Sequence, residues 1–271
     1  MFSLLKKLDC YGLSFIGKRS SNQDKFVIYQ SNGLTLLAVA DGMGGAKGGE
    51  IASNIAIKSA CKVIDETSGA GKKDLKWILE KIYRKADEEI TKVHTEHSDL
   101  NGMGTTLSCA LVKNEAFVCG NVGDSRVYHF NGDEFRKITE DHTYVEQYLK
   151  QFGPPVPQEA MYSSNIIYRA MTGEGDKPDI FPENEQYLTL KNGEALLLCS
   201  DGLIPDKSED QEGVLKAYVT GFESLKESTE QLICNAYYSG STDNITVIIA
   251  SMGNLKRKDF NLDKETYPPE E

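Results

Sequence analysis

Five apolar stretches of this chain each carry an aspartate at one end, inside a turn of small residues. Three of them end on the aspartate, in "VADGM" (Asp41), "GNVGDSR" (Asp124) and "CSDGL" (Asp201). Two begin after it, in "SNQDKFVI" (Asp24) and "STDNITVIIA" (Asp243). A single Asp-Gly or Asp-Asn is ordinary turn chemistry. In antiparallel sheets, however, the end of one strand lies beside the start of its neighbour, so the pattern predicts five carboxylates at one edge.

Short strand-like runs dominate the chain, and pairs of helical segments interrupt them. Strands are predicted over residues 13–16, 26–29, 34–40, 106–112, 116–120, 126–130, 195–199 and 245–249. Helical spacing covers 49–63 and 74–94, and a further pair lies within 214–238. Asn131-Gly132 and Asn192-Gly193 are hairpin signals. Antiparallel strands without a regular strand–helix alternation indicate an α+β fold with helices outside the sheets.

The chain has the length of one large domain. It has 271 residues, and neither an internal repeat nor a clear linker divides it. We expect a single domain over 1–252. Within this domain, about 151–179 contains "FGPPVP" near its start, has weak periodicity and is predicted to form a flap. The charged segment 253–271 is expected to be a loose tail.

Charge and composition exclude several classes of function. The 41 acidic and 30 basic side chains give a net charge of −11, which argues against nucleic acid as a partner. The six cysteines are scattered and form no CxxC motif, as expected for reduced thiols. No stretch reaches the roughly 18 apolar residues of a membrane span, and "MFSLLKKLDC" lacks the apolar core of a signal peptide. We therefore expect a cytoplasmic protein that does not act at a membrane.

Aspartates gathered at one edge would repel one another. Two unit charges about 5 Å apart cost roughly 3 kcal/mol at an effective dielectric constant of 20. Such a cluster has to hold protons or bind cations, and carboxylates with backbone carbonyls suit Mg²⁺ or Mn²⁺. Gly42, directly after Asp41, leaves its carbonyl open to such an ion. Metal is therefore the predicted partner of Asp41.

Two other motifs allow different chemistry. Ser125 in "GDSR" and His142 in "EDHT" make a serine hydrolase conceivable, although the GxSxG motif is absent. "GMGGAKGG" invites comparison with a nucleotide loop. Lys47, however, stands where the third glycine of GxGxxG should fall, and no GK[ST] follows. The nucleotide loop is therefore set aside.

Seven motifs, taken in order, resemble those of the metal-dependent protein phosphatases, the type 2C serine/threonine phosphatases, and above all their bacterial members. The motifs are "RSSNQD", "VADGMGGAKGGEIAS", "GMGTTL", "GNVGDSRVY", "ITEDHT", "CSDGL" and "STDNITVIIA", and they span roughly residues 11–252. The resemblance implies a four-layer α-β-β-α sandwich with two central antiparallel sheets. It also implies a protein-serine/threonine phosphatase that hydrolyses phosphoserine and phosphothreonine.

The resemblance assigns a metal-binding role to five residues. Asp41 would bridge two metals, and the Gly42 carbonyl would be a further ligand. Asp201 and Asp243 would complete the ligands of the first metal. Asp124 would hold a third, weaker metal that shares Asp201. Mn²⁺ or Mg²⁺ is the implied cofactor, with two ions in the core site.

The resemblance also implies the reaction. A hydroxide that bridges the core metals would attack phosphorus directly, while the metals and Arg19 neutralise the phosphate oxygens. The planar fork of Arg19 suits phosphate, and Asp24 would orient metal-bound water, so that Asp41, Asp24 and Arg19 form the implied catalytic set. Ala46 and Met43 stand where bacterial and eukaryotic relatives, respectively, usually carry histidine. The general acid for the leaving group is therefore not assigned.

The implied partners are phosphorylated proteins, the products of a serine/threonine kinase, and the chain is expected to act as a monomer in signalling. An alternative on the same fold is a catalytically weak or inactive domain that binds phosphoproteins, which the missing histidine at Ala46 motivates. Turnover that depends on Mn²⁺ separates the two.

Overall fold

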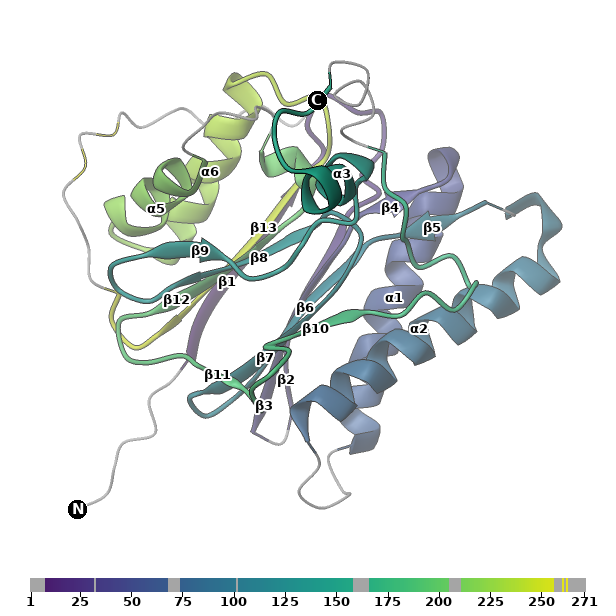
Figure 1. Cartoon of the computed structure of the whole chain (residues 1–271), viewed down its shortest axis with the longest axis horizontal. Coiled ribbons are helices and arrows are strands. Elements are labelled where there is room, and N and C mark those ends of the chain that lie inside the picture. Colours follow the sequence, from purple (N-terminus) through teal and green to yellow (C-terminus); the bar gives the residue numbers. More distant parts are fainter. Residues whose placement is uncertain are drawn as a thin grey trace.

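Two antiparallel sheets lie face to face, and a pair of helices covers the outer side of each (Figure 1). The computed structural model describes residues 8–31, 33–67, 74–100, 102–157, 166–204, 211–255, 260 and 262. The expected four-layer α-β-β-α sandwich is confirmed. Within the described ranges, no helix combines the length and the apolar character needed to cross a membrane.

The first sheet has the strand order β1-β13-β12-β8-β9. Its strands are β1 (Leu8–Phe15), β8 (Arg126–Phe130), β9 (Phe135–Lys137), β12 (Ala195–Cys199) and β13 (Ile245–Met252). Two helices, α5 (Gln211–Gly221) and α6 (Leu225–Tyr238), pack on its outer face through a cluster of buried apolar side chains.

The second sheet has the order β10-β7-β6-β3-β2, and β11 also pairs with β7. Its strands are β2 (Lys25–Ser31), β3 (Leu34–Ala40), β6 (Leu107–Lys113), β7 (Ala116–Val122), β10 (Asp179–Phe181) and β11 (Leu188–Thr189). It is covered by α1 (Gly45–Thr67) and α2 (Leu75–Glu96). The remaining elements are the short pair β4 (Gly42–Met43) and β5 (Gly104–Thr105), helix α3 (Tyr144–Phe152), and the single turns Ser98–Leu100 and Asp201–Leu203.

The central strands are buried on both faces. In β3, Leu36 and Ala38 face the helices, whereas Leu37 and Val39 face the other sheet. Strands buried on both sides read as continuous apolar runs rather than as alternating ones. A carboxylate is therefore tolerated only where such a strand ends, as Asp41 does after β3.

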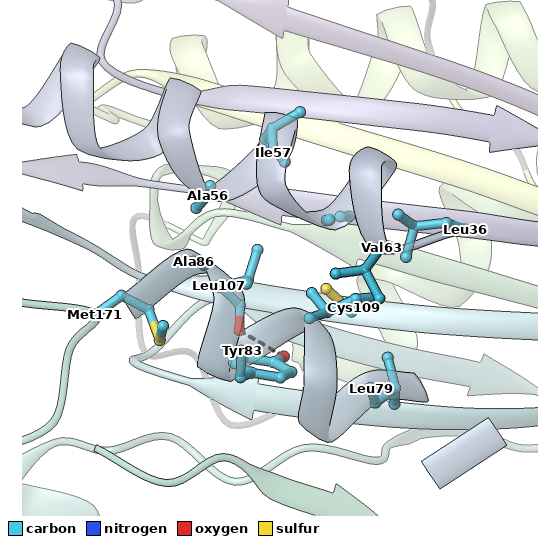
Figure 2. Close-up of a cluster of buried hydrophobic side chains, with 14 of the residues drawn as sticks. Leu36, Ala56, Ile57, Val63, Leu79, Tyr83, Ala86, Leu107, Cys109 and Met171 are labelled. Carbon is cyan, nitrogen blue, oxygen red and sulfur yellow. Dashed lines mark hydrogen bonds between the residues drawn. The ribbon is translucent and has the colours of Figure 1, made fainter. Parts of the chain in front are cut away.

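Helix α2 is joined to the second sheet through a tyrosine. Asp74 caps the helix by accepting a hydrogen bond from the Lys76 N–H. Figure 2 shows Tyr83 pointing from α2 into the apolar cluster, where its hydroxyl donates to the Leu107 carbonyl at 3.0 Å. The ring lies over Gly120 of β7, at which an added Cβ would stand 2.7 Å from a ring carbon of Tyr83. Gly120 therefore provides the space that the ring fills.

Several boundaries differ from the sequence prediction. Helix α1 begins at Gly45, four residues before the predicted start, so part of the glycine-rich stretch is helical. Asn192-Gly193 is a turn but not a hairpin, because β11 and β12, on either side of it, lie in different sheets. The predicted tail from 253 lies largely outside the described residues. Its described part is not loose throughout, because Leu255 is buried beside α5 and α6.

Gly120→Ala is expected to lower the free energy of unfolding by roughly 1–3 kcal/mol, the usual cost of overpacking a core. The added methyl group would collide with the Tyr83 ring. Urea denaturation followed by circular dichroism measures the change. In a Tyr83→Leu background the same substitution should cost less, and an equal cost in both backgrounds would contradict the contact.

Candidate metal centre

The strand register brings the aspartate-bearing turns together. Lys25 pairs with Ala40, so Asp24 and Asp41 lie on adjacent strand ends. Cys199 pairs with Val247, which places Asp201 and Asp243 at the same edge of the other sheet. The two sheets face each other, and their aspartate-bearing ends meet. The structure thus gathers residues that are more than 200 positions apart in the sequence.

The gathered carboxylates act strongly on one another. Partial burial raises the pKa of Asp41 well above its ordinary value, and the neighbouring charges of Asp24, Asp201, Asp124 and Asp243 raise it further. All five aspartates therefore share one electrostatic environment, as the sequence pattern predicts.

Asp24 is the most deeply buried of the five. Only 2% of it is exposed, and the Ser200 hydroxyl donates to its Oδ2 at 2.7 Å. Burial raises the pKa of Asp24 to about 6, although hydrogen bonds from Thr246 and Ser200 partly offset the effect. Its other oxygen, Oδ1, is buried without a hydrogen-bond partner.

Asp201 and Asp124 are perturbed in the same direction. Burial raises the pKa of Asp201, the charge of Asp243 adds to this, and a hydrogen bond with Asp41 partly offsets it. Asp201 Oδ1 is also buried without a partner. Burial and then the charges of Asp201 and Asp141 raise the pKa of Asp124 to about 7.

Two adjoining cavities, each of about 430 Å³, are lined by four of the five aspartates, all except Asp24. Asp41, Gly42, Arg19 and Met43 line the first, and Asp124 and Asp201 line the second. Asp243 lines both and so connects them.

Arg19 stands at the mouth of the first cavity. One guanidinium nitrogen, Nη2, donates to Asp243 Oδ2 at 2.6 Å, and this bond raises the pKa of Arg19. The side chain is still 55% exposed, so part of it remains accessible to a ligand. Asn244 fixes the loop that carries Arg19, because its amide donates to the carbonyls of Ile16 and Ser21.

A pair of threonines holds the backbone of Asp41. The Asp41 N–H donates to Thr106 Oγ1 at 2.9 Å, and the Thr105 hydroxyl donates to the Asp41 carbonyl at 2.8 Å. Thr106 Oγ1 also lies 2.7 Å from Ser125 Oγ, next to Asp124. The "GMGTTL" motif therefore ties the Asp41 turn to the Asp124 turn, a role that the sequence analysis did not identify.

Gly49 is another positioning residue that the sequence analysis missed. An added Cβ on Gly42 would stand 2.1 Å from the Gly49 carbonyl oxygen, so the start of α1 packs directly against the backbone beside Asp41. Glycine inside a helix is unfavourable and needs a packing reason. The paired glycines of "AKGGE" are the signal that could have revealed this contact.

The site fits hard cations, because it contains buried oxygens that no hydrogen-bond donor satisfies. Among the described residues, no group of three His, Cys, Asp or Glu side chains is arranged so that it could hold a metal ion as it stands. Two buried carboxylate oxygens nevertheless lack any donor, which is costly unless a cation or a proton satisfies them. The described residues that line the two cavities include neither cysteine nor histidine. A donor set made only of oxygen suits Mg²⁺ or Mn²⁺ better than Zn²⁺.

The serine hydrolase alternative is wrong. The Ser125 hydroxyl is buried against Thr106, and both ring nitrogens of His142 are engaged elsewhere. Its Nδ1 accepts from the Gly123 N–H, and its Nε2 is bonded to Asp179. Ser125 therefore lacks the general base that a nucleophile requires.

Comparison with known proteins gives the family. A family model described as protein phosphatase 2C matches residues 11–235, and the chain belongs to this family. The serine/threonine phosphatase Stp of Listeria innocua is 34% identical over 248 residues, which are 89% of this chain and 93% of Stp.

Solved structures agree with this assignment. The Mycobacterium tuberculosis serine/threonine phosphatase PstP superposes with a TM-score of 0.77 at 32% identity, covering 91% of this chain and 99% of that one. The catalytic domain of PstP in complex with two manganese ions gives 0.75 at 30% identity, with the same coverage.

Mn²⁺ is expected to stabilise the protein more at pH 7.5 than at pH 5. The folded pKa values of Asp24 and Asp124, about 6 and 7, lie above the unfolded value near 4. The folded state therefore binds more protons, and these groups lose stabilising free energy as the pH rises from 4 to 7. A cation offsets that loss only where the carboxylates are ionised.

Thermal unfolding in EDTA and in Mn²⁺ measures the difference. At a hundredfold excess over Kd, one site adds about 2.7 kcal/mol, which is roughly 5–10 °C for a domain of this size. Asp201→Asn should reduce the shift at pH 7.5. An equal shift at both pH values would contradict the assignment of the carboxylates.

Proposed function

We propose that this chain is a serine/threonine protein phosphatase that hydrolyses phosphoserine and phosphothreonine in proteins with the help of Mn²⁺ or Mg²⁺. One observation carries the proposal: aspartates from five strand ends converge, four of them line two adjoining cavities, and two of the buried aspartate oxygens have no partner. Membership of the protein phosphatase 2C family supports it, as do relatives named serine/threonine phosphatases.

Different residues of the cluster would bind different cations. Asp41, the Gly42 carbonyl, Asp201 and Asp243 would hold two ions, and Asp124 with Asp201 would hold a third. The catalytic domain of PstP, known in complex with two manganese ions, supports a core site of two ions. Bound divalent cations neutralise carboxylates and lower the pKa of water, so that hydroxide is available near neutral pH.

Arg19 would bind the substrate phosphate, and Asp24 would orient the water. The exposed part of the Arg19 fork can donate to two phosphate oxygens at once, which a dianion needs before it can approach this acidic site. Asp24 is held by Ser200 through one oxygen, and its other oxygen is left to accept a hydrogen bond from water. Together with Asp41 they would form the catalytic set.

The leaving serine or threonine oxygen would take its proton from water. None of the described residues that line the Asp41 cavity is a histidine, and Met43 occupies part of that lining. Ala46 lies in the first turn of α1. A missing side-chain acid lowers the rate without removing the route, because charge neutralisation and orientation supply most of the acceleration in phosphoryl transfer.

The expected partners follow from the same site. Phosphoproteins made by a serine/threonine kinase would be the substrates, and one copy of the chain would suffice, because it alone supplies all five aspartates and Arg19. A cytoplasmic location is also part of the proposal, and it is supported by the six free cysteines. A single domain over 1–252, with a flap about 151–179, stays a prediction.

Asp41→Asn and Asp243→Asn should nearly abolish Mn²⁺-dependent hydrolysis of p-nitrophenyl phosphate and of a phosphothreonine peptide. Each substitution removes a charged ligand, and EDTA should have the same effect on the wild type until Mn²⁺ is restored. Asp65→Asn, whose carboxylate accepts from the Tyr29 hydroxyl on the outer face of the second sheet, is the matched control and should retain activity. Activity that survives thorough chelation would rule the proposal out.

Arg19→Ala should raise KM by roughly 10- to 100-fold, because it removes hydrogen bonds of about 1.5–3 kcal/mol each to a charged group. Arg19→Lys keeps the charge but loses the fork, so its KM should lie between those of the wild type and of Arg19→Ala. Arg84→Ala, which removes an exposed arginine beside Glu88 on α2, is the control.

The inactive alternative makes a different prediction. A phosphoprotein-binding domain without catalysis would still bind Mn²⁺, with the thermal shift described above, and would capture the phosphopeptide. It would release no phosphate at saturating Mn²⁺. Measuring binding and phosphate release on one sample therefore separates the two functions.

A further inference from the structure

His142 holds the residue before Asp124 from both sides. The backbone N–H of Gly123 donates to the ring nitrogen Nδ1 of His142 at 3.0 Å. The backbone N–H of His142 donates in turn to the Gly123 carbonyl, also at 3.0 Å. The histidine is only 1% exposed. One buried side chain and its own backbone thus form a clamp on the turn that carries Asp124.

The clamp fixes the protonation of the ring. A backbone N–H can only donate, so Nδ1 has to be the acceptor and the proton resides on Nε2. That nitrogen lies 3.0 Å from Asp179 Oδ2 and donates to it. The ring therefore has a defined orientation between Gly123 and Asp179, as in carboxylate–histidine pairs that orient metal sites.

Asp179 is itself held firmly. Arg169 donates to both of its oxygens, at 2.9 and 3.3 Å. In β10, Asp179 pairs with Asn121 of β7, two residues before Gly123. Two residues after Arg169, Met171 is fully buried and pairs with Thr105, which anchors this segment to the core (Figure 2). The ring of His142 therefore rests on a rigid support.

The other end of the turn is fixed by Thr106, which lies within hydrogen-bonding distance of Ser125. Gly123 has φ of +103°, and an added Cβ would stand 2.5 Å from the Thr106 side chain. Both neighbours of Asp124 are therefore immobilised, by His142 on one side and by Thr106 on the other. The Asp124 carboxylate is left to face the second cavity.

We propose that His142 is a positioning residue that sets the affinity of the Asp124 site for a divalent cation by clamping Gly123. The inference rests on the proposed function, which gives Asp124 a cation to hold. His142 does not touch the cation or the substrate and acts through the backbone of the turn. This positioning role accounts for the histidine of the "EDHT" motif, to which the proposed function assigns no role.

Two substitutions of His142 test the two hydrogen bonds of its ring one at a time. His142→Asn keeps an acceptor attached to Cγ, where Nδ1 was, but cannot reach Asp179. His142→Gln can reach Asp179 but leaves the Gly123 N–H without a partner. His129→Gln is the matched control, because His129 is a largely enclosed histidine on β8, its side chain 12% exposed, that is likewise bonded through Nε2 to a carboxylate, that of Glu194, at 3.0 Å.

Mn²⁺ titration calorimetry and amide hydrogen exchange on the metal-free protein give the readouts. His142→Gln should weaken the weakest Mn²⁺ site by about 10- to 100-fold, the usual effect of removing such a supporting group. The tighter sites should be unchanged, and exchange of the Gly123 amide should accelerate. His142→Asn should lose less affinity and keep the Gly123 amide protected, whereas His129→Gln should match the wild type at both readouts.

Equal losses in the two His142 variants, or a comparable loss in His129→Gln, would overturn the inference, because they would point to a general structural effect. Unchanged exchange at Gly123 in His142→Gln would overturn it as well. The variant Asp124→Asn distinguishes failure of this inference from failure of the proposed function. If that variant loses the weakest site while His142→Gln does not, only the inference fails, and if Asp124→Asn binds like the wild type, the metal role of Asp124 fails.

Discussion

Repulsion among carboxylates at the ends of buried strands is the constraint on which the rest of the structure depends. Burial raises the pKa of Asp41, Asp24, Asp124 and Asp201, and each is raised further by other aspartates of the cluster. A polar surface would not gather such residues, since they would separate in water. They stay together because each is attached to a strand whose apolar faces are packed between a helix layer and the opposite sheet.

Apart from the ion pair between Arg19 and Asp243, neutral groups hold the cluster in place. Thr105 and Thr106 fix the backbone of Asp41, Ser200 binds Asp24, and Asn244 ties the loop of Arg19 to β13. Hydroxyl and amide groups satisfy the backbone without neutralising the carboxylates. The site is therefore rigid while its negative charge remains available, which is the condition for preorganised cation binding.

The sequence predicts the positions of the carboxylates better than it predicts what supports them. Strands buried on both faces give a strong apolar signal, and β3, β8 and β12 begin and end where they are expected. The early start of α1 is not visible locally, because Gly49 is required by a contact with Gly42 and not by helix propensity. The anchoring of Met171 beside Thr105 is equally hidden, since the two residues are far apart in sequence and the segment has weak periodicity. Tertiary contacts of this kind leave no period to detect.

The shortage of positive charge is local to the cluster and does not follow from the acidic composition of the whole chain. Asp141 also lines the second cavity, where it is paired with Arg126, at 2.7 and 2.9 Å, and with Lys137 at 3.2 Å, so two cations neutralise its charge. Arg19, in contrast, reaches only Asp243 among the five clustered aspartates. An acidic residue close to the site is thus neutralised by side chains, whereas the cluster itself is not. Longer basic side chains could have been placed there, as they are at Asp141. The cluster instead keeps buried carboxylate oxygens without donors, which a compact, hard cation satisfies better than a guanidinium group.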